Sequence, residues 1–236
     1  MRKNGVRSML VLVMVLLVLV LADVSFSEEF CMSGDFTWVS TYIWRGIRQF
    51  EGNTLQGIIS GNWKYLSFGV WYSSVSFGDG TLMETDPFLN LSFNKGSLSG
   101  GIGMTYYSYD FKKWNGYADH EIELAVNAGF SPVGISIYYI PKQASTKGDL
   151  KCSNYWIELS SASNTLDMHW GIIIGYGTYS SRYLEMPKKE AIGNVTLSAQ
   201  KEVIDQLTVG WYYEIPFRTD LENSFWISCS LSYKIE

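Results

Sequence analysis

The sequence predicts an all-β fold: a transmembrane antiparallel up-and-down β-barrel of about 12 strands that follows a cleaved signal peptide. Three observations predict it. The chain of 236 residues opens on a basic and then apolar segment. Pieces of about ten residues then alternate apolar and polar side chains, as the strands of membrane barrels do. Charged residues make up 17% of the chain, whereas soluble domains average about 25%.

Residues 1–22 are expected to be the signal peptide, and residues 23–236 the barrel. The apolar run from Met9 to Leu21 is shorter than the roughly 20 residues that a spanning helix needs. A basic region precedes it, and small residues suited to cleavage end it at Ala22. An uncleaved anchor is the alternative. Removing the segment takes the net charge from −5 to −8, because it holds three basic residues and no acid. That balance argues against nucleic-acid binding.

The pieces that carry the alternation are predicted to be the strands of the barrel. One face of each is apolar and uncharged, as with Leu124, Val126 and Ala128. A charge that faces lipid at mid-bilayer would cost about 2–4 kcal/mol, so the absence of charge supports a membrane barrel. The predicted strands are residues 35–45, 54–63, 66–76, 85–93, 98–109, 119–130, 133–140, 154–160, 166–177, 193–201, 207–215 and 224–233.

The connections between these strands alternate in length. Short ones such as 64–65 and 131–132 alternate with longer ones such as 46–53, 110–118 and 141–153. Tight periplasmic turns and longer external loops are the plan of an outer-membrane barrel. An even number of strands places both chain ends on the periplasmic side.

The end of the first predicted strand resembles a known family. The segment Tyr42-Ile43-Trp44-Arg45-Gly46-Ile47-Arg48-Gln49 precedes an acidic loop with Glu51-Gly52, then Gln56-Gly57 and the run Gly69-Val70-Trp71-Tyr72-Ser73-Ser74-Val75. This text is similar to the TorF-type outer-membrane porin family, a bacterial family of unknown function, over roughly residues 36–140. The resemblance implies an outer-membrane barrel with a channel role and no particular solute. It carries over only the family motif Trp44, Arg45 and Gly46.

One departure concerns the last strand. Outer-membrane barrels of this kind usually end on an aromatic residue, which the assembly machinery recognises. Here Tyr233 is followed by Lys234, Ile235 and Glu236. The last strand therefore departs from the pattern that the assembly machinery recognises.

Arg45 is the first candidate functional residue. It shares strand parity with Val39 and Thr41, opposite Tyr42 and Trp44, so we expect it to face the lumen near the external mouth. One interpretation is a channel-lining cation that screens solutes. The other is an interior ion pair that holds the barrel wall or the first loop.

Polar residues on the predicted luminal faces are further channel-lining candidates. Rings of acidic side chains favour cations, so the carboxylates predict a mild cation preference. Glu121 and Glu123 share one face about 7 Å apart, a separation that also suits acid–base chemistry, but a polar lumen needs hydrophilic lining in any case. The candidates besides Arg45 are Glu121, Glu123, Glu158, His169 and Glu214.

The tryptophans are divided between the two faces. Outward ones are expected to anchor the barrel at the membrane interfaces. Inward ones are expected to narrow or plug the lumen. The outward set is Trp38, Trp44, Trp63, Trp170 and Trp211, and the inward set is Trp71, Trp156 and Trp226.

The sequence favours an outer-membrane porin-like channel for passive diffusion of small hydrophilic solutes. A non-conducting structural or surface-interaction barrel is the first alternative, and a barrel lipase or acyltransferase the second. The expected partners are outer-membrane lipids, small hydrophilic solutes, periplasmic chaperones and the barrel-assembly machinery. No cofactor or metal is expected. A disulfide scaffold is not expected either, since the cysteines, Cys31, Cys152 and Cys229, are odd in number and lack a CxxC spacing.

Overall fold

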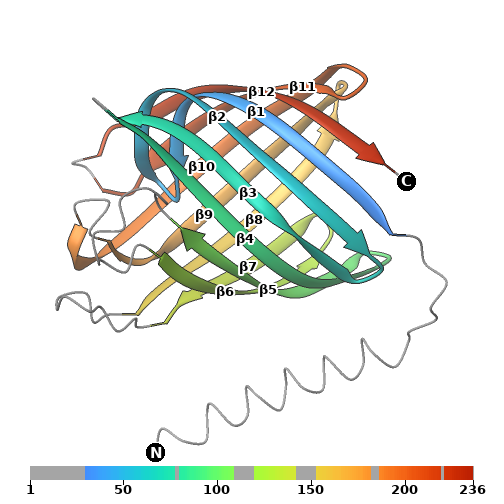
Figure 1. The fold of residues 1–236 in the computed structure, drawn as a ribbon. Helices are drawn as coiled ribbons and strands as arrows, with labels where there is room; N and C mark the ends of the chain where they lie inside the picture. Colours follow the sequence, from blue (N-terminus) through green and yellow to red (C-terminus); the bar gives the residue numbers. More distant parts are fainter. Residues whose placement is uncertain are drawn as a thin grey trace, which may run out of the picture.

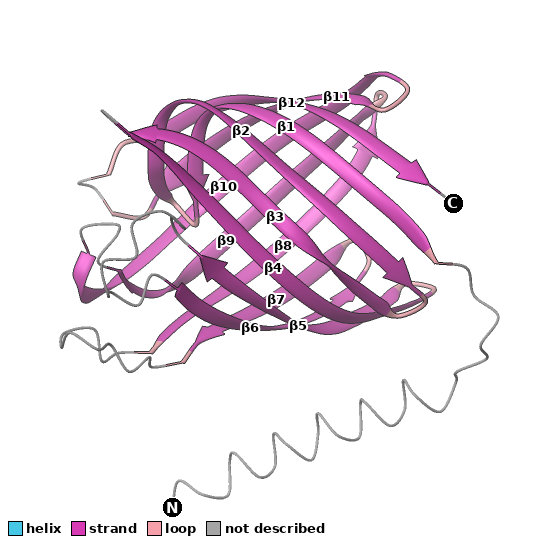
Figure 2. Ribbon diagram, in the orientation of Figure 1, coloured by secondary structure: helices cyan, strands magenta, loops and turns pink. Residues whose placement is uncertain are grey.

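The computed structural model describes residues 30–77, 80–108, 120–141, 153–181, 186–218 and 221–235. In these residues, 12 antiparallel strands follow one another around a closed barrel (Figures 1 and 2). The predicted fold class is therefore confirmed. The predicted signal peptide lies outside the described residues. Within them, no helix is long and apolar enough to cross a membrane.

The strand bounds differ from the predicted ones mainly at one end of the barrel. The strands are β1 (Cys31–Trp44), β2 (Ile47–Trp63), β3 (Leu66–Phe77), β4 (Gly80–Lys95), β5 (Leu98–Ser108), β6 (His120–Phe130), β7 (Val133–Ile140), β8 (Asn154–Thr165), β9 (Met168–Ser181), β10 (Met186–Ile204), β11 (Leu207–Pro216) and β12 (Ser224–Ile235).

The barrel closes between its first and last strands. β1 pairs with β12 from Met32, opposite Ile235, to Val39, opposite Ser228. A hydroxyl contact of 2.8 Å between Thr37 and Ser230 joins the two strands on the inner face. Closure satisfies the edge amides, which an open sheet would leave unpaired in hydrocarbon.

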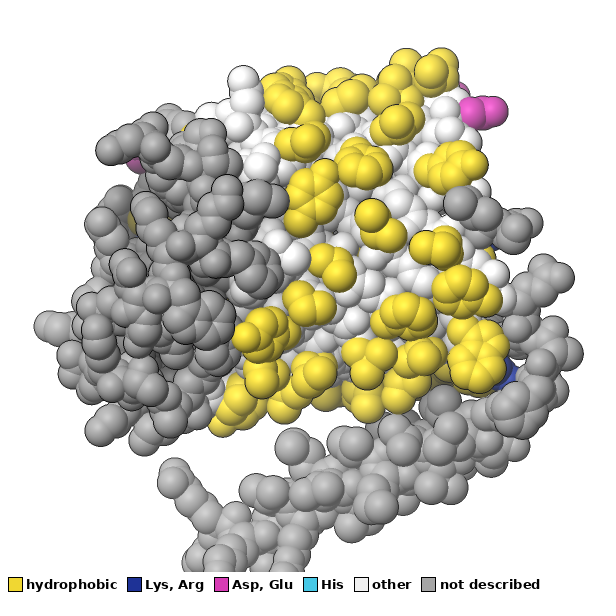
Figure 3. All heavy atoms as spheres, viewed as in Figure 1, with side chains coloured by type: hydrophobic (Ala, Val, Ile, Leu, Met, Phe, Trp, Pro, Cys, Tyr) yellow, Lys and Arg dark blue, Asp and Glu magenta, His cyan; other side chains and the backbone are white. Residues whose placement is uncertain are grey.

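The outer face of the wall is apolar, as the alternation predicts. Val70 on β3, Val126 on β6 and Leu159 on β8 are 40%, 50% and 49% exposed. In Figure 3, hydrophobic side chains are spread over the described part of the visible face, and charged ones lie towards its ends. An uncharged outer band on a closed barrel is suited to contact with lipid.

One end of the barrel carries tight turns, and we call it the turn end. Connections of two residues join β2 to β3 at Lys64-Tyr65 and β8 to β9 at Leu166-Asp167. Leu166 and Asp167 both have φ of 56°, as two-residue hairpin turns require. β1 begins and β12 ends at this end (Figure 1), where the sequence predicts the periplasmic side.

At the opposite end of the barrel, one prediction is wrong. Residues 46–53 were expected to form a longer loop, but Arg45 and Gly46 form a two-residue turn and β2 begins at Ile47. The alternation fails there because a hairpin that leaves the membrane wall has no lipid face. β10 likewise begins at Met186, seven residues before the predicted 193. The predicted loop 110–118 lies outside the described residues, as does nearly all of 141–153.

Candidate functional site in the barrel lumen

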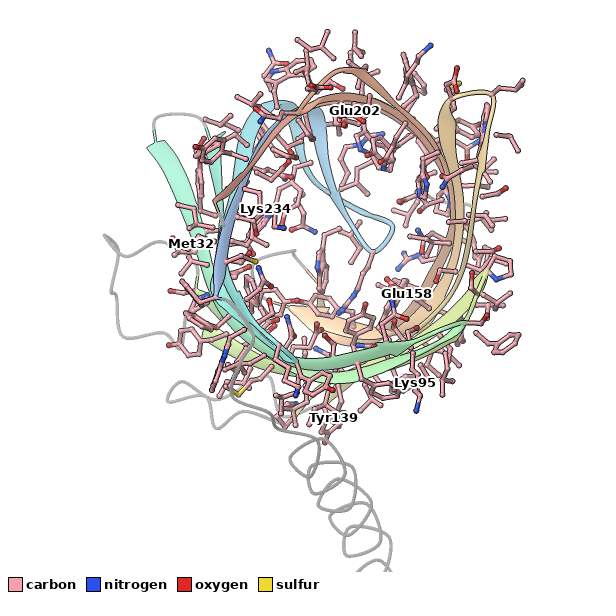
Figure 4. The ribbon with its side chains drawn as sticks, turned by 90° about the vertical axis from the view of Figure 1, so that its right-hand side faces the viewer. Met32, Lys95, Tyr139, Glu158, Glu202 and Lys234 are labelled. Atoms are coloured by element: carbon pink, nitrogen blue, oxygen red, sulfur yellow. The ribbon has the colours of Figure 1, made fainter. Side chains whose placement is uncertain are left out.

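The end of the β1–β2 hairpin lies inside the barrel. Figure 4, a view towards the turn end, shows this hairpin within the ring of strands. Two β-bulges precede its tip, between Val39 and Thr41 and between Tyr42 and Ile43, each with an extra residue on β2. Bulges bend the strand that carries them. The bends therefore account for the departure of the hairpin from the wall.

Two aromatic side chains of the hairpin, Tyr42 and Trp44, pack inside the lumen. Tyr42 donates a hydrogen bond of 3.0 Å to Glu84 on β4. The ring of Trp44 lies 4.8 Å from that of Tyr179 on β9 and 6.1 Å from that of Tyr107 on β5. The prediction that Trp44 faces lipid is therefore wrong. Parity identifies the lipid face only while a strand is part of the wall, and both faces of this hairpin lie within the barrel.

Arg45, at the tip, is buried in an ion pair with β6. Its Nη1 and Nη2 lie 2.6 and 2.9 Å from the two carboxylate oxygens of Glu123. The two side chains are only 9% and 4% exposed. The interior ion pair considered for Arg45 is thus present in the structure. A two-point contact matches the planar fork of the guanidinium group.

Aromatic rings complete the surroundings of the guanidinium group. Its Cζ lies 4.5 Å from the ring centre of Trp44, 4.4 Å from that of Tyr138 on β7 and 5.9 Å from that of Trp156 on β8. Such distances allow cation–π attraction. We call Glu123, Trp44, Tyr138 and Trp156 the Arg45 cage. The space left beside it is a cavity of about 10 Å³.

A second carboxylate holds the two wall aromatics of the cage. The indole Nε1 of Trp156 donates a 2.9 Å hydrogen bond to Glu158, and the hydroxyl of Tyr138 donates one of 3.2 Å to the same carboxylate. On the other side, the hydroxyl of Tyr107 donates to Glu123 at 3.0 Å. These bonds all join wall residues to wall residues. They orient Glu123, Tyr138 and Trp156, the wall residues of the cage, independently of the hairpin.

Gly46 brings the tip against the far wall. Its φ is +79°, and a Cβ added there would lie 3.2 Å from the Cβ of Asn194 on β10 and 3.5 Å from Glu214 on β11. Glu214 in turn accepts a 3.2 Å hydrogen bond from Thr196. The ring of Tyr42 also lies 5.9 Å from that of Trp71 on β3. The hairpin thus touches wall strands on both sides of the lumen, from β3 and β4 to β10 and β11.

Replacing Gly46 by alanine is expected to loosen the tip. The left-handed backbone costs an L residue about 1–2 kcal/mol, and the added methyl would press on Asn194. On the channel interpretation of the sequence, we expect larger single-channel conductance from the refolded variant. Gly96→Ala is the matched control, because Gly96 also has positive φ, +62°, but open space around it. Equal conductance of the two variants would contradict a packing role for Gly46.

The other predicted site residues lie in different places. Glu121 accepts a 3.2 Å hydrogen bond from Tyr179. Glu123 is instead bound by Arg45 and Tyr107, so the two carboxylates share no partner among these bonds. His169 lies towards the turn end, with Nδ1 2.6 Å from Oδ1 of Asn164. His169 and Asn164 line a cavity of about 490 Å³ together with Gln200, Glu202 and Thr208. The structure therefore does not bring His169 into contact with the cage.

Two buried luminal acids were missing from the predicted site. Asp86 on β4 is 3% exposed and accepts a 3.1 Å hydrogen bond from the amide of Ser108. Glu84 accepts the bond from Tyr42. The alternation on β4, with Leu89 outward, would have identified Asp86. Among the described residues, no group of three or more His, Cys, Asp or Glu could hold a metal ion.

The lumen differs along its length. Towards the turn end its inner face is accessible to solvent: Asn127 is exposed, and Ile173 is 38% exposed although it shares the inner face with Gly171 and Gly175. At the level of the hairpin the inner face is buried, with Trp156 and Asn194 each 3% exposed. Among the described residues, the hairpin therefore narrows a lumen whose inner face is accessible to solvent towards the turn end.

Comparisons with known proteins concern the fold. No protein-family model matches the chain, and no curated protein matches it. The structure of the KdgM porin is 10% identical, with a TM-score of 0.56 over 86% of this chain and 99% of that chain. The COG4313 outer membrane channel from Pseudomonas putida F1 is also 10% identical, with a TM-score of 0.55 over 90% and 99%. With its closed sheet and apolar band, the chain is a barrel of the bacterial outer membrane.

Proposed function

We propose that the chain is an outer-membrane channel for passive diffusion of small hydrophilic solutes, constricted by the β1–β2 hairpin. One observation carries the proposal. The pairing of β1 with β12 ends at Val39, and that of β2 with β3 ends at Leu55, so in the described residues the hairpin between them forms a strand ladder only with itself. Side-chain contacts hold it in the lumen, and its release would widen the passage.

The charge of the inner wall supports a preference for cations. Glu84, Asp86, Glu121, Glu158 and Glu214 are luminal in addition to Glu123. The ion pair of Arg45 engages Glu123 alone among these acids. Acidic linings favour cations in narrow pores.

Recording from the refolded mature protein in a planar bilayer tests the channel. We expect small, discrete, salt-dependent steps, and a reversal potential in a KCl gradient that reports preference for K⁺. Replacing Glu214 by glutamine should weaken that preference, because Glu214 lies at the constriction. Anion preference of the wild-type protein would contradict the acidic-lumen explanation.

A non-conducting barrel is the second candidate, and the packing of the cage favours it. Only about 10 Å³ remains beside Arg45. Silence of both the wild-type protein and a variant without Arg45, each shown to be folded by a heat-dependent gel shift, would support this candidate. The barrel-enzyme alternative stays a prediction, which refolded protein and labelled phospholipid would test.

We also propose membership of the TorF-type porin family that the sequence resembles. The motif Trp44, Arg45 and Gly46 supports it, because these residues form the tip of the hairpin. A motif at a constriction has a direct role in a channel.

A further inference from the structure

We infer that the wall half of the Arg45 cage, which consists of Glu123, Tyr138 and Trp156, is a binding site for guanidinium groups. Arg45 of the hairpin occupies this site in the structure. The inference rests on the proposed channel and names its solute class: small cations that carry a guanidinium group. Such a solute would take the place of Arg45 and release the hairpin.

The contacts of Arg45 define what the site recognises. Glu123 receives two parallel N–H donors at 2.6 and 2.9 Å, and the face of Tyr138 lies 4.4 Å from Cζ. A guanidinium group satisfies both contacts at once because it is planar and has donors in a fixed fork. An ammonium group is a point charge and cannot reproduce the forked contact together with stacking on the ring.

The wall half of the site is formed without the hairpin. Glu123, Tyr138 and Trp156 come from β6, β7 and β8, three successive strands of the wall. Tyr107 orients Glu123 from β5, and Glu158 orients both aromatic rings. A site whose residues are held by their own neighbours is preorganised for a ligand. It should therefore retain its shape when Arg45 leaves.

Arg45 and a solute cannot occupy the site together. The remaining cavity of about 10 Å³ is far smaller than a guanidinium group. Since the hairpin forms a strand ladder only with itself, its tip can leave without breaking the ladders of the wall. A ligand that binds only the released state shifts the hairpin towards release. Guanidinium solutes would then both open the constriction and bind in it.

Release of Arg45 also exposes an excess of negative charge. Glu123 loses its only described ion pair, and Glu121 and Glu158 lie on the same wall, with bonds to Tyr179, Tyr138 and Trp156. An incoming cation would restore the balance that Arg45 provides.

Calorimetric titration of the folded Arg45→Ala barrel in detergent micelles tests the inference. The probe is ethylguanidinium chloride, and ethylammonium chloride at the same ionic strength is the comparison. We expect saturable binding of ethylguanidinium, about tenfold tighter than that of ethylammonium. Wild-type protein should bind it more weakly than the variant, because Arg45 competes.

Two double variants distinguish specific binding at Glu123 from a general effect of negative charge. Arg45→Ala with Glu123→Gln should lose the binding, whereas Arg45→Ala with Glu202→Gln should retain it, because Glu202 is exposed at the turn end. If Arg45→Ala does not fold, Arg45→Gln is titrated in the same way. Absence of saturable binding, or equal binding of the two cations, would overturn the inference. Binding without conductance in a bilayer would instead overturn the channel proposal.

Discussion

Replacing Arg45 by alanine is expected to raise the open fraction of the proposed channel by about 100-fold. Loss of one member of a buried ion pair costs about 3–5 kcal/mol, because the partner remains buried and uncompensated. Here that partner is Glu123, at 4% side-chain exposure. Since about 1.4 kcal/mol is a factor of ten, a loss of roughly 3 kcal/mol from the docked hairpin gives this shift. Release of the hairpin would let water reach Glu123.

Single-channel recording of the variant in a planar bilayer measures the open fraction directly. Arg48→Ala is the matched control, because Arg48 lies on the same hairpin but is exposed, with a 3.1 Å bond to Ser224. Exposed contacts of this kind contribute about 0–1 kcal/mol, so the control should behave almost as the wild type does. If the two variants have the same open fraction, the cage does not hold the hairpin.

Replacing Val126 by arginine is expected to destabilise the barrel by about 2–4 kcal/mol, the cost of a charge facing the middle of the bilayer. Val126 is 50% exposed on the outer face, and its neighbours across the ladders are Ile102 and Ile137. Denaturant titration of the protein in lipid vesicles measures the free energy of unfolding. A lipid-facing arginine can neither pair nor reach water without distorting the bilayer.

Asn127→Arg is the control for this effect. Asn127 is the next residue on β6, so it faces the lumen, and it is exposed to solvent there. An arginine at this position would remain hydrated, and its cost should be small. If both substitutions destabilise equally, the assignment of the two faces of β6 is wrong.

The wall of the barrel could be predicted from the sequence because lipid imposes a simple rule. A lipid-facing residue such as Val126 must be apolar, whereas the residues before and after it in the strand face the lumen and need not be. The alternation therefore predicts where each strand lies and which of its faces is lipid-facing. Within the hairpin the rule does not apply. Trp44 lies inside the barrel although its parity with Trp38 suggests lipid. The predicted loop 46–53 was wrong for the same reason.

Only part of the candidate site could be predicted from the sequence. Alternation placed Glu123, Tyr138 and Trp156 on inner faces, and Arg45 near the mouth. It could not bring Arg45 and Glu123 together, because they are 78 positions apart and the pairing depends on how far the hairpin bends. The bend comes from bulges on β2, and single extra residues leave no clear mark on a pattern of period two.

The hairpin docks against strands that come later in the chain. Its residues lie between β1 and β2, whereas the residues that hold its tip lie on strands from β6 to β11. Contacts between distant segments form late, because the entropy of closing the intervening loop must be overcome first. Docking of the tip is therefore expected to follow the placement of the strands that hold it. A spectroscopic probe on the hairpin would report when this step occurs.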